Sequence, residues 1–187
     1  MRKGSSIHTY TKTEFWPLDP KVEEVKLLDI AHALSLTCRA NGHANHFFSV
    51  AQHSINCAKE AKHRGYSQRV QLACLLHDGS EAYISDMIRP VKRYIDSYLE
   101  VETTLQDTIY EKFGLGDLTE EEFNQVFRID DAMLRYEMTV LMNNDEFKGE
   151  EVSEQYDLSF KVMEEVEKEF IQLIEQLQAA LVETVTN

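Results

Sequence analysis

Residues 72–79 read LACLLHDG, an uninterrupted run of apolar and small residues that leads into His77 and Asp78. The run predicts a buried helix that carries an imidazole and a carboxylate together into the interior. Buried polar groups need a partner, and a divalent metal is a suitable one for imidazole nitrogen and carboxylate oxygen. The alternative is an ordinary hydrogen-bonded His–Asp pair at a helix end, which the dipeptide taken alone favours.

The chain before this run also reads as helical. Residues 27–38 carry apolar side chains at helical spacing, and residues 49–63 form a second predicted helix that ends before Gly65. Ser67 is placed to cap the helix that contains the quoted run. The residues up to about Pro20 have no helical pattern and predict an irregular or weakly extended arm.

The chain after the run continues in the same way. Residues 90–113 read as one amphipathic helix that stops at Gly114. Thr119 and the glutamate three residues later form a capping box that opens a long helix reaching about Met142. A last helix occupies much of residues 158–185. It contains no motif that indicates a function, so we expect it to serve packing or an oligomer surface.

These elements predict an all-α, single-domain helical bundle over residues 1–187. Only three prolines and seven glycines leave little room for the dense turns of a β-fold. A chain of 187 residues with 43% hydrophobic residues is long enough for one sizeable core. We find no internal repeat, low-complexity tract or Gly/Ser linker that would divide the chain.

The charge balance bears on the kind of partner. The chain has 33 acidic and 19 basic residues, a formal net charge of −14, which repels a nucleic-acid backbone. We therefore expect no nucleic-acid polymer as partner, and the missing basic groove also disfavours a ribonuclease or phosphodiesterase. A small anionic substrate is compatible with this charge, because a bound cation and a few arginines can reverse the field locally.

The cysteines and the N-terminus bear on the compartment. Cys38, Cys57 and Cys74 are an odd number without CxxC spacing, which predicts free thiols in a reducing cytoplasm. The first 16 residues lack an apolar signal core, and no window reaches the roughly 18 apolar residues of a membrane span. Cys57 follows His53 by one helical turn and Cys74 precedes His77 by about one turn, so both are candidate soft ligands, although packing is the usual role of such residues.

Further candidate ligands lie on other predicted helices. His53 sits between apolar positions in the helix before the quoted run, and Asp130 and Asp131 appear in a later helix, in the stretch RIDDAML. Together with His77 and Asp78, His53 and either Asp130 or Asp131 place two histidines and two aspartates on three helices. Such a set can converge on one metal only in a bundle, where facing helices project side chains inward.

The ordered set His53, His77-Asp78 and Asp130 resembles the H…HD…D signature of the HD-domain phosphohydrolases. Three longer blocks resemble bacterial 5′-deoxynucleotidases and related phage dNTP hydrolases. They are CRANGHANHFFSVAQHS at residues 38–54, LLHDGSEAYISDMIRPVK at residues 75–92 and IDDAMLRYE at residues 129–137. The resemblance covers residues 15–142 approximately, and the order of the three blocks makes it specific.

The resemblance implies that His53, His77, Asp78 and Asp130 bind one divalent metal. Asp130 is preferred to Asp131 because the register D-x-A-M-L-x-x-E matches that of the family. The ligand types accept Mn, Co, Ni, Fe, Zn or Mg, and the sequence does not choose between them. The resemblance also implies a homodimer.

Three further residues match catalytic positions of the family. Glu81 matches the acid after the HD pair, and it can orient a metal-activated water and move its proton. Arg39 matches an upstream arginine whose donor fork suits a phosphate; without the resemblance, a surface salt bridge is equally reasonable. Asp86 matches an acid that can hold Arg39 or accept a hydrogen bond from the sugar 3′-hydroxyl, and its competing role is an N-cap for the segment from Met87.

Weaker candidates surround these positions. His43 can touch a phosphate from a loop, and Lys92 can help bind a polyphosphate, although exposed loop and helix charges are common. Phe47, Phe48 and Tyr83 are candidates for a wall beside the base, although aromatic residues at such spacings more often belong to the core.

The function implied is a metal-dependent phosphohydrolase, most specifically a 5′-deoxynucleotidase that releases phosphate from dNMPs. The alternative is a dNTP triphosphohydrolase of the phage type. A third hypothesis is a catalytically silent HD module that binds a nucleotide, for which Glu81 and Arg39 would be dispensable.

Overall fold

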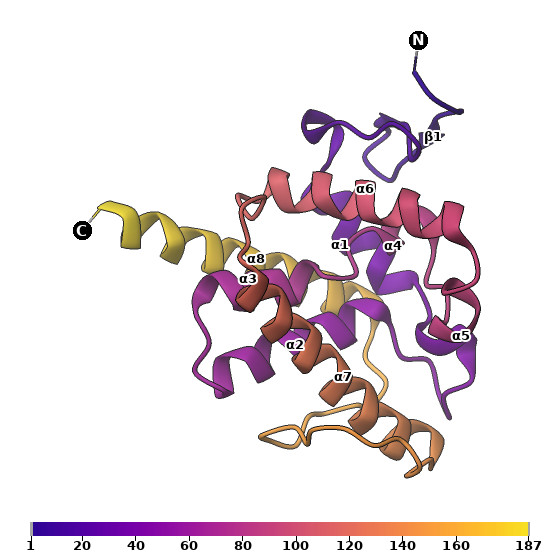
Figure 1. Cartoon of the computed structure of the whole chain (residues 1–187), viewed down its shortest axis with the longest axis vertical. Coiled ribbons are helices and arrows are strands. Elements are labelled where there is room, and N and C mark those ends of the chain that lie inside the picture. The colour runs from indigo at the N-terminus through magenta and orange to yellow at the C-terminus, as the bar shows by residue number, and fades with distance from the viewer. Residues whose placement is uncertain (1, 187) are drawn as a thin grey trace.

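A computed structural model describes residues 2–186, with side chains described as far as residue 183. The chain folds into an α-helical bundle with a small N-terminal hairpin (Figure 1). In chain order its elements are β1 (Ile7–His8), β2 (Glu14–Phe15), η1 (Val22–Glu24), α1 (Leu27–Leu36), η2 (Arg39–Gly42), α2 (Val50–His63), α3 (Gln68–Leu76), α4 (Glu81–Ile84), α5 (Arg89–Lys92), α6 (Asp96–Lys112), α7 (Glu120–Met142) and α8 (Met163–Thr186). The all-α prediction is confirmed.

The centre of the bundle is the pair α2 and α3, with α1, α7 and α8 packed around it. Every residue of the run 72–76 is fully buried, because α3 is covered by neighbouring helices on all sides. The C-terminal helix α8 packs on α1 and α3 through Val166, Phe170 and Ile174. Of its two predicted roles, packing or an oligomer surface, the structure supports packing. No helix within residues 2–186 has an apolar stretch long enough to cross a bilayer.

The predicted helix starts are confirmed by their caps. The Ser67 hydroxyl accepts the Val70 N–H at 3.2 Å and begins α3. Thr119 and Glu122 form a reciprocal capping box at the start of α7, as predicted. These local hydrogen bonds fix the residues at which α3 and α7 begin.

The predicted single helix over residues 90–113 is wrong. The chain forms the short α5 and then α6, and Ile95 between them has an extended backbone with φ −123° and ψ 81°. The break lets α6 fold back beside α5, where Lys92 pairs with Glu102 and the Tyr98 hydroxyl donates to the Ser85 carbonyl at 2.8 Å. The apolar spacing continues through the turn, which is why the sequence pattern does not reveal it.

A buried carboxylate anchors the segment that follows α7. Glu60 in α2 is fully buried and accepts hydrogen bonds from the Tyr156 hydroxyl at 2.6 Å and from Ser153, and it pairs with Arg64 at 2.6 Å. Burial alone would raise the pKa of Glu60, but the hydrogen bonds from Tyr156, Arg64 and Ser153 outweigh it and lower that pKa. Glu60 therefore ties residues 153–156 to the core as a carboxylate.

Replacing this carboxylate is expected to destabilise the fold. Glu60→Gln should lower the free energy of unfolding by about 2–3 kcal/mol, because Arg64 Nε and the Tyr156 hydroxyl lose their buried charged acceptor. The lowered pKa of Glu60 means that its contribution is complete above roughly pH 4.3 and is lost as the pH falls through the folded-state value. Urea unfolding of wild type and variant at several pH values measures both effects.

The matched control is Glu150→Gln, which removes the exposed second partner of Arg64. Exposed ion pairs contribute little to stability because water screens them, so this variant should unfold close to wild type. Equal stability of Glu60→Gln and Glu150→Gln at neutral pH would contradict the anchoring role.

Candidate metal centre and adjoining pocket

Four side chains from three parts of the bundle converge at one point. His53 Nε2 on α2 lies 3.3 Å from His77 Nε2 and 3.2 Å from Asp130 Oδ1 on α7. His77 Nε2 lies 3.3 Å from Asp78 Oδ2 and 3.6 Å from Asp130 Oδ1, and the His53–Asp78 pair is 3.8 Å apart. Donor atoms that share one ion at roughly 2.1 Å lie about 3–4 Å from each other. The spacing of these atoms therefore fits a single metal ion.

In each histidine ring, the hydrogen bond of Nδ1 fixes the orientation of Nε2, the nitrogen that faces the cluster. His77 Nδ1 donates to the Cys74 carbonyl at 2.7 Å, and His53 Nδ1 donates to Glu137 Oε1 at 2.7 Å. Carbonyl and carboxylate oxygens only accept, so in each neutral ring the Nε2 atom presents a lone pair to the centre. The Arg39 guanidinium lies at this pair in the structure, with Nη2 3.0 Å from His53 Nε2.

Glu137 is a site residue to which the sequence pattern assigned no role. Its side chain is 5% exposed, and besides His53 it accepts from Arg39 Nε at 3.4 Å. It lies seven residues after Asp130, which is two helical turns, so both project from the same face of α7. That spacing is the signal that would have found it.

The two adjacent aspartates of α7 have different surroundings. Asp130 Oδ1 faces the histidines, while its Oδ2 accepts from Arg89. Asp131 is 37% exposed and also pairs with Arg89, through its Oδ1. The structure thus brings Asp130 and not Asp131 into the cluster, and Arg89 holds the Asp130 carboxylate with one oxygen turned inward.

Arg39 lies inside the acidic cluster. Its Nη2 donates to His53 Nε2 at 3.0 Å, and its Nη1 donates to Asp78 Oδ2 at 3.2 Å. Burial alone would lower the pKa of Arg39, but the carboxylates, Glu137 first, raise it well above its usual value. At 14% side-chain exposure, Arg39 does not form the surface salt bridge that was the alternative interpretation.

Asp86 braces the loop that carries Arg39. Its Oδ2 accepts the Ala40 N–H at 3.2 Å. Ala40 and Asn41 both have left-handed backbones, with φ of 54° and 52°, a conformation that costs energy in a residue with a Cβ. The N-cap of α5 is Ile88, with no side-chain cap, so the alternative role of Asp86 as an N-cap is not borne out.

A pocket of about 520 Å³ opens beside the cluster. Among the predicted site residues it is lined by Arg39, His43, Asp78, Glu81, Asp86, Lys92 and Asp130. Its apolar lining comes from Met87, Ile88, Pro90, Leu134, Met138, Met142 and Phe147. One cavity thus contains anionic, cationic and apolar parts, which suits a ligand with a phosphate at one end and a ring at the other.

Glu81 is the buried acid of this pocket. Its side chain is almost fully buried, and Oε2 has no hydrogen-bond partner among residues 2–186. Burial, together with the charges of Asp78 and Asp86, raises the pKa of Glu81 well above its usual value. Glu81 is therefore able to hold a proton close to the cluster.

The predicted aromatic wall is wrong for this pocket. Phe48 is fully buried in the core, and Tyr83 stacks on Phe15 with ring centroids 4.1 Å apart. Phe47 contacts Phe160 instead, at 6.5 Å between centroids. None of the three predicted aromatic residues lines the pocket, since packing against distant segments takes them elsewhere.

Cys57 lies at the edge of the cluster, with Sγ 3.5 Å from His53 Nε2. His53, Cys57 and His77 form a group that could hold a metal ion, with ligand atoms within 4.8 Å of one another. Burial raises the pKa of the Cys57 thiol to about 11. All three cysteines are free, in agreement with the sequence prediction.

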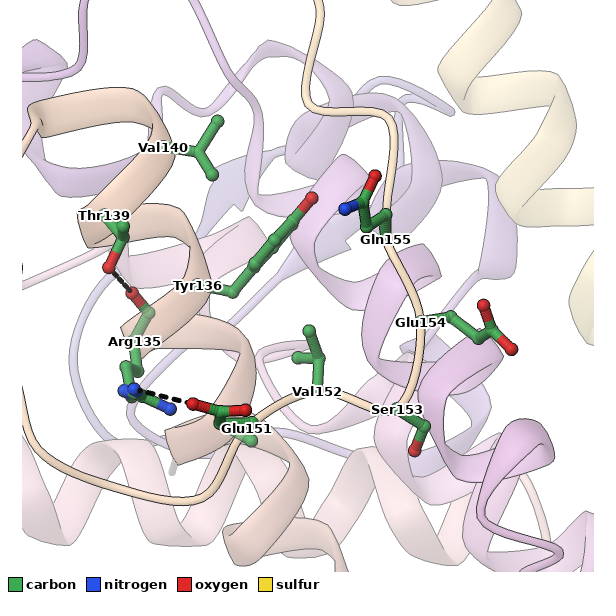
Figure 2. A pocket seen from close by; sticks show the side chains of 10 residues that line it. Arg135, Tyr136, Thr139, Val140, Glu151, Val152, Ser153, Glu154 and Gln155 are labelled. Carbon is green, nitrogen blue, oxygen red and sulfur yellow. Dashed lines mark hydrogen bonds and ion pairs between the residues drawn. The ribbon is translucent and has the colours of Figure 1, made fainter.

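A second pocket, of about 560 Å³, lies between another face of α7 and residues 151–155 (Figure 2). At the edge of this pocket Arg135 pairs with Glu151 at 3.2 Å, and the Tyr136 side chain points from α7 toward the coil of residues 151–155 (Figure 2). None of the predicted site residues lines it. The predicted site residues therefore gather at the pocket beside His53 and His77 and not at this one.

No family model matches the chain. It is 35% identical over 111 residues to the uncharacterized protein YfdR of Escherichia coli (strain K12), which covers 59% of this chain and 60% of that protein. It is 37% identical over 103 residues to an uncharacterized protein of Rhodobacter capsulatus, with 52% and 53% of the two chains covered. The chain thus matches less than two thirds of either relative's length, and neither name specifies an activity.

Proposed function

We propose that the chain is a metal-dependent phosphohydrolase of the HD superfamily that hydrolyses dNMPs to deoxynucleoside and phosphate. The observation that carries the proposal is the convergence of His53, His77, Asp78 and Asp130 beside a pocket with charged and apolar linings. An acidic surface with a net charge of −14 supports a small substrate over a nucleic-acid polymer.

The proposed metal is one divalent ion, Mn, Co, Ni, Fe, Zn or Mg, held by the two Nε2 atoms, Asp78 Oδ2 and Asp130 Oδ1. The His53–Glu137 and His77–carbonyl hydrogen bonds support this set, since they aim both lone pairs at one point. When bound, such an ion supplies Lewis-acid polarisation of a phosphoryl oxygen and lowers the pKa of a water molecule. Cys57 stays a packing residue in this proposal.

The protein's own groups would bind the phosphate and move the proton. Arg39 lines the pocket next to Asp78, and Asp86 fixes its loop through the Ala40 N–H. In this structure Nη1 and Nη2 of Arg39 donate to Asp78 and His53, and in the proposal they turn from these ligand atoms to the phosphate oxygens when the metal binds. Glu81 orients the attacking water and takes its proton on Oε2, the oxygen without a partner among the described residues. Asp86 Oδ1, His43 and Lys92 contribute contacts to sugar and phosphate at the rim.

The alternative substrate is a dNTP, cleaved to deoxynucleoside and triphosphate. The lining that favours it is cationic: Arg89, Lys92 and Arg93 follow one another along one side of the pocket. Lys92 and Arg89 already pair with Glu102 and with Asp130 and Asp131, which supports the monophosphate as the first choice. The predicted homodimer and the cytoplasmic location stay predictions.

A substrate panel tests the proposal. Purified protein loaded in turn with Mn, Co, Ni, Zn or Mg is offered dNMPs, NMPs and dNTPs, and the released anion is identified. Orthophosphate from dAMP is the expected result, and triphosphate from dATP would favour the alternative. No release under any condition would remove both and leave the nucleotide-binding module.

Arg89 is expected to position Asp130 for the metal. Arg89→Gln should weaken Mn²⁺ binding about tenfold, because Asp130 Oδ2 loses its charged donor and the carboxylate is free to rotate. Asp131→Asn is the matched control, since it removes the exposed partner of Arg89 and keeps the Arg89–Asp130 contact. Calorimetric titration with Mn²⁺ measures both affinities, and equal affinity of Arg89→Gln and wild type would contradict the positioning role.

A further inference from the structure

One face of α7 continues from the metal centre along the pocket. Asp130, Leu134, Met138 and Met142 follow one another at intervals of four residues, and all four line the cavity. Residues four apart lie on nearly the same face of a helix. At about 1.5 Å per residue, Met138 is roughly 12 Å and Met142 roughly 18 Å along the axis from Asp130.

This face changes character along its length. It starts with the carboxylate that faces the histidines and continues with Leu134, Met138 and Met142, which we call the α7 wall. Phe147, from the segment after α7, adds an apolar ring at 40% exposure to the same cavity. Methionine side chains are flexible and polarizable, so they adapt to the faces and edges of flat rings.

We propose that the α7 wall is the subsite for the nucleobase of the substrate. This inference rests on the proposed function: with the phosphate beside Asp130, the sugar lies beside Leu134 and the base reaches Met138, while Met142 closes the far end of the cavity. The progression from charged to apolar along one helix matches the progression from phosphate to sugar to base in a nucleoside 5′-phosphate. The α7 wall thus takes the place of the predicted aromatic wall of Phe47, Phe48 and Tyr83, whose side chains pack elsewhere.

The chemistry of the α7 wall implies weak discrimination between bases. Leu and Met side chains carry no hydrogen-bond donor, so they recognise the size and flatness of a ring more than its polar edge. Apolar pockets discriminate between ligands of similar shape only modestly. We expect purine dNMPs to bind more tightly than pyrimidine dNMPs, and dAMP and dGMP to differ by less than about tenfold.

The test compares a substrate with a base and one without. Met138→Ala should raise KM for dAMP about tenfold and leave KM for 2-deoxyribose 5-phosphate within about twofold of wild type, with kcat for both little changed. Met138→Leu, which conserves volume, should restore the dAMP value. The control Val140→Ala lies on the face of α7 toward the other pocket (Figure 2) and should leave both values as in wild type.

The outcome separates this inference from the proposed function. An unchanged KM for dAMP in Met138→Ala, or an equal rise for 2-deoxyribose 5-phosphate, would overturn the base subsite while phosphate release upholds the hydrolase. If wild type releases no phosphate, the proposed function fails. The base subsite is then tested by calorimetry, which compares the Kd of dAMP for Mn²⁺-loaded wild type with that for Mn²⁺-loaded Met138→Ala. A tenfold weaker Kd supports it, and equal Kd values overturn it.

Discussion

Replacing His77 with alanine is expected to remove the bound metal and to lower phosphate release from dAMP by at least about a hundredfold, a loss that changes in residues hydrogen-bonded to the ligands can already cause. His77 Nε2 is within 3.6 Å of His53 Nε2, Asp78 Oδ2 and Asp130 Oδ1, so its loss leaves the proposed ion with one side open. Metal analysis after dialysis and the phosphate assay measure the two effects independently.

The control for this variant is His8→Ala, which removes an exposed histidine from the N-terminal hairpin, outside the cluster. It should keep both the metal and the activity of wild type. Circular dichroism shows whether His77→Ala remains folded, as expected for a side chain at the end of α3 whose only backbone partner is the Cys74 carbonyl among the described residues. A folded His77→Ala protein that retains stoichiometric metal contradicts the proposed ligand set.

Glu81→Gln is expected to lower kcat by about 10²–10⁴, the usual contribution of a positioned acid–base group. The substitution keeps the shape of the side chain and removes its ability to take a proton on Oε2, while the four proposed ligands are unchanged. Metal content and KM for dAMP should therefore stay near their wild-type values, and steady-state kinetics separates kcat from KM.

The matched control is Glu120→Gln, an exposed glutamate in the first turn of α7, which should have full activity. Wild-type kcat in Glu81→Gln would remove Glu81 as the proton carrier. A loss of metal in Glu81→Gln would instead make Glu81 part of the metal site.

The parts of the fold that could be predicted from the sequence are those determined locally. The Ser67 cap and the Thr119 capping box mark helix starts by short-range hydrogen bonds. The break at Ile95 depends on contacts of Lys92 and Tyr98 with residues further along or back in the chain, and apolar periodicity does not register such contacts. Tertiary packing decided that boundary.

The candidate site divides in the same way. The buried run before His77 signals a polar pair carried into the interior, and the structure brings that pair together with His53 and Asp130. The spacing from Asp130 places Glu137 on the site face of α7, but its hydrogen bond with His53 could not be predicted, because His53 is 84 residues away and the contact depends on how α2 and α7 pack. Phe48 could not be assigned correctly by spacing, since a buried core ring and a pocket wall show the same apolar pattern.

Crystals grown with Mn²⁺ and measured for anomalous scattering test directly whether two histidines and two aspartates bind one divalent ion. We expect a single strong peak about 2–2.3 Å from His53 Nε2, His77 Nε2, Asp78 Oδ2 and Asp130 Oδ1. A map without a peak at saturating Mn²⁺, or a peak bound by Cys57 in place of the aspartates, would contradict it.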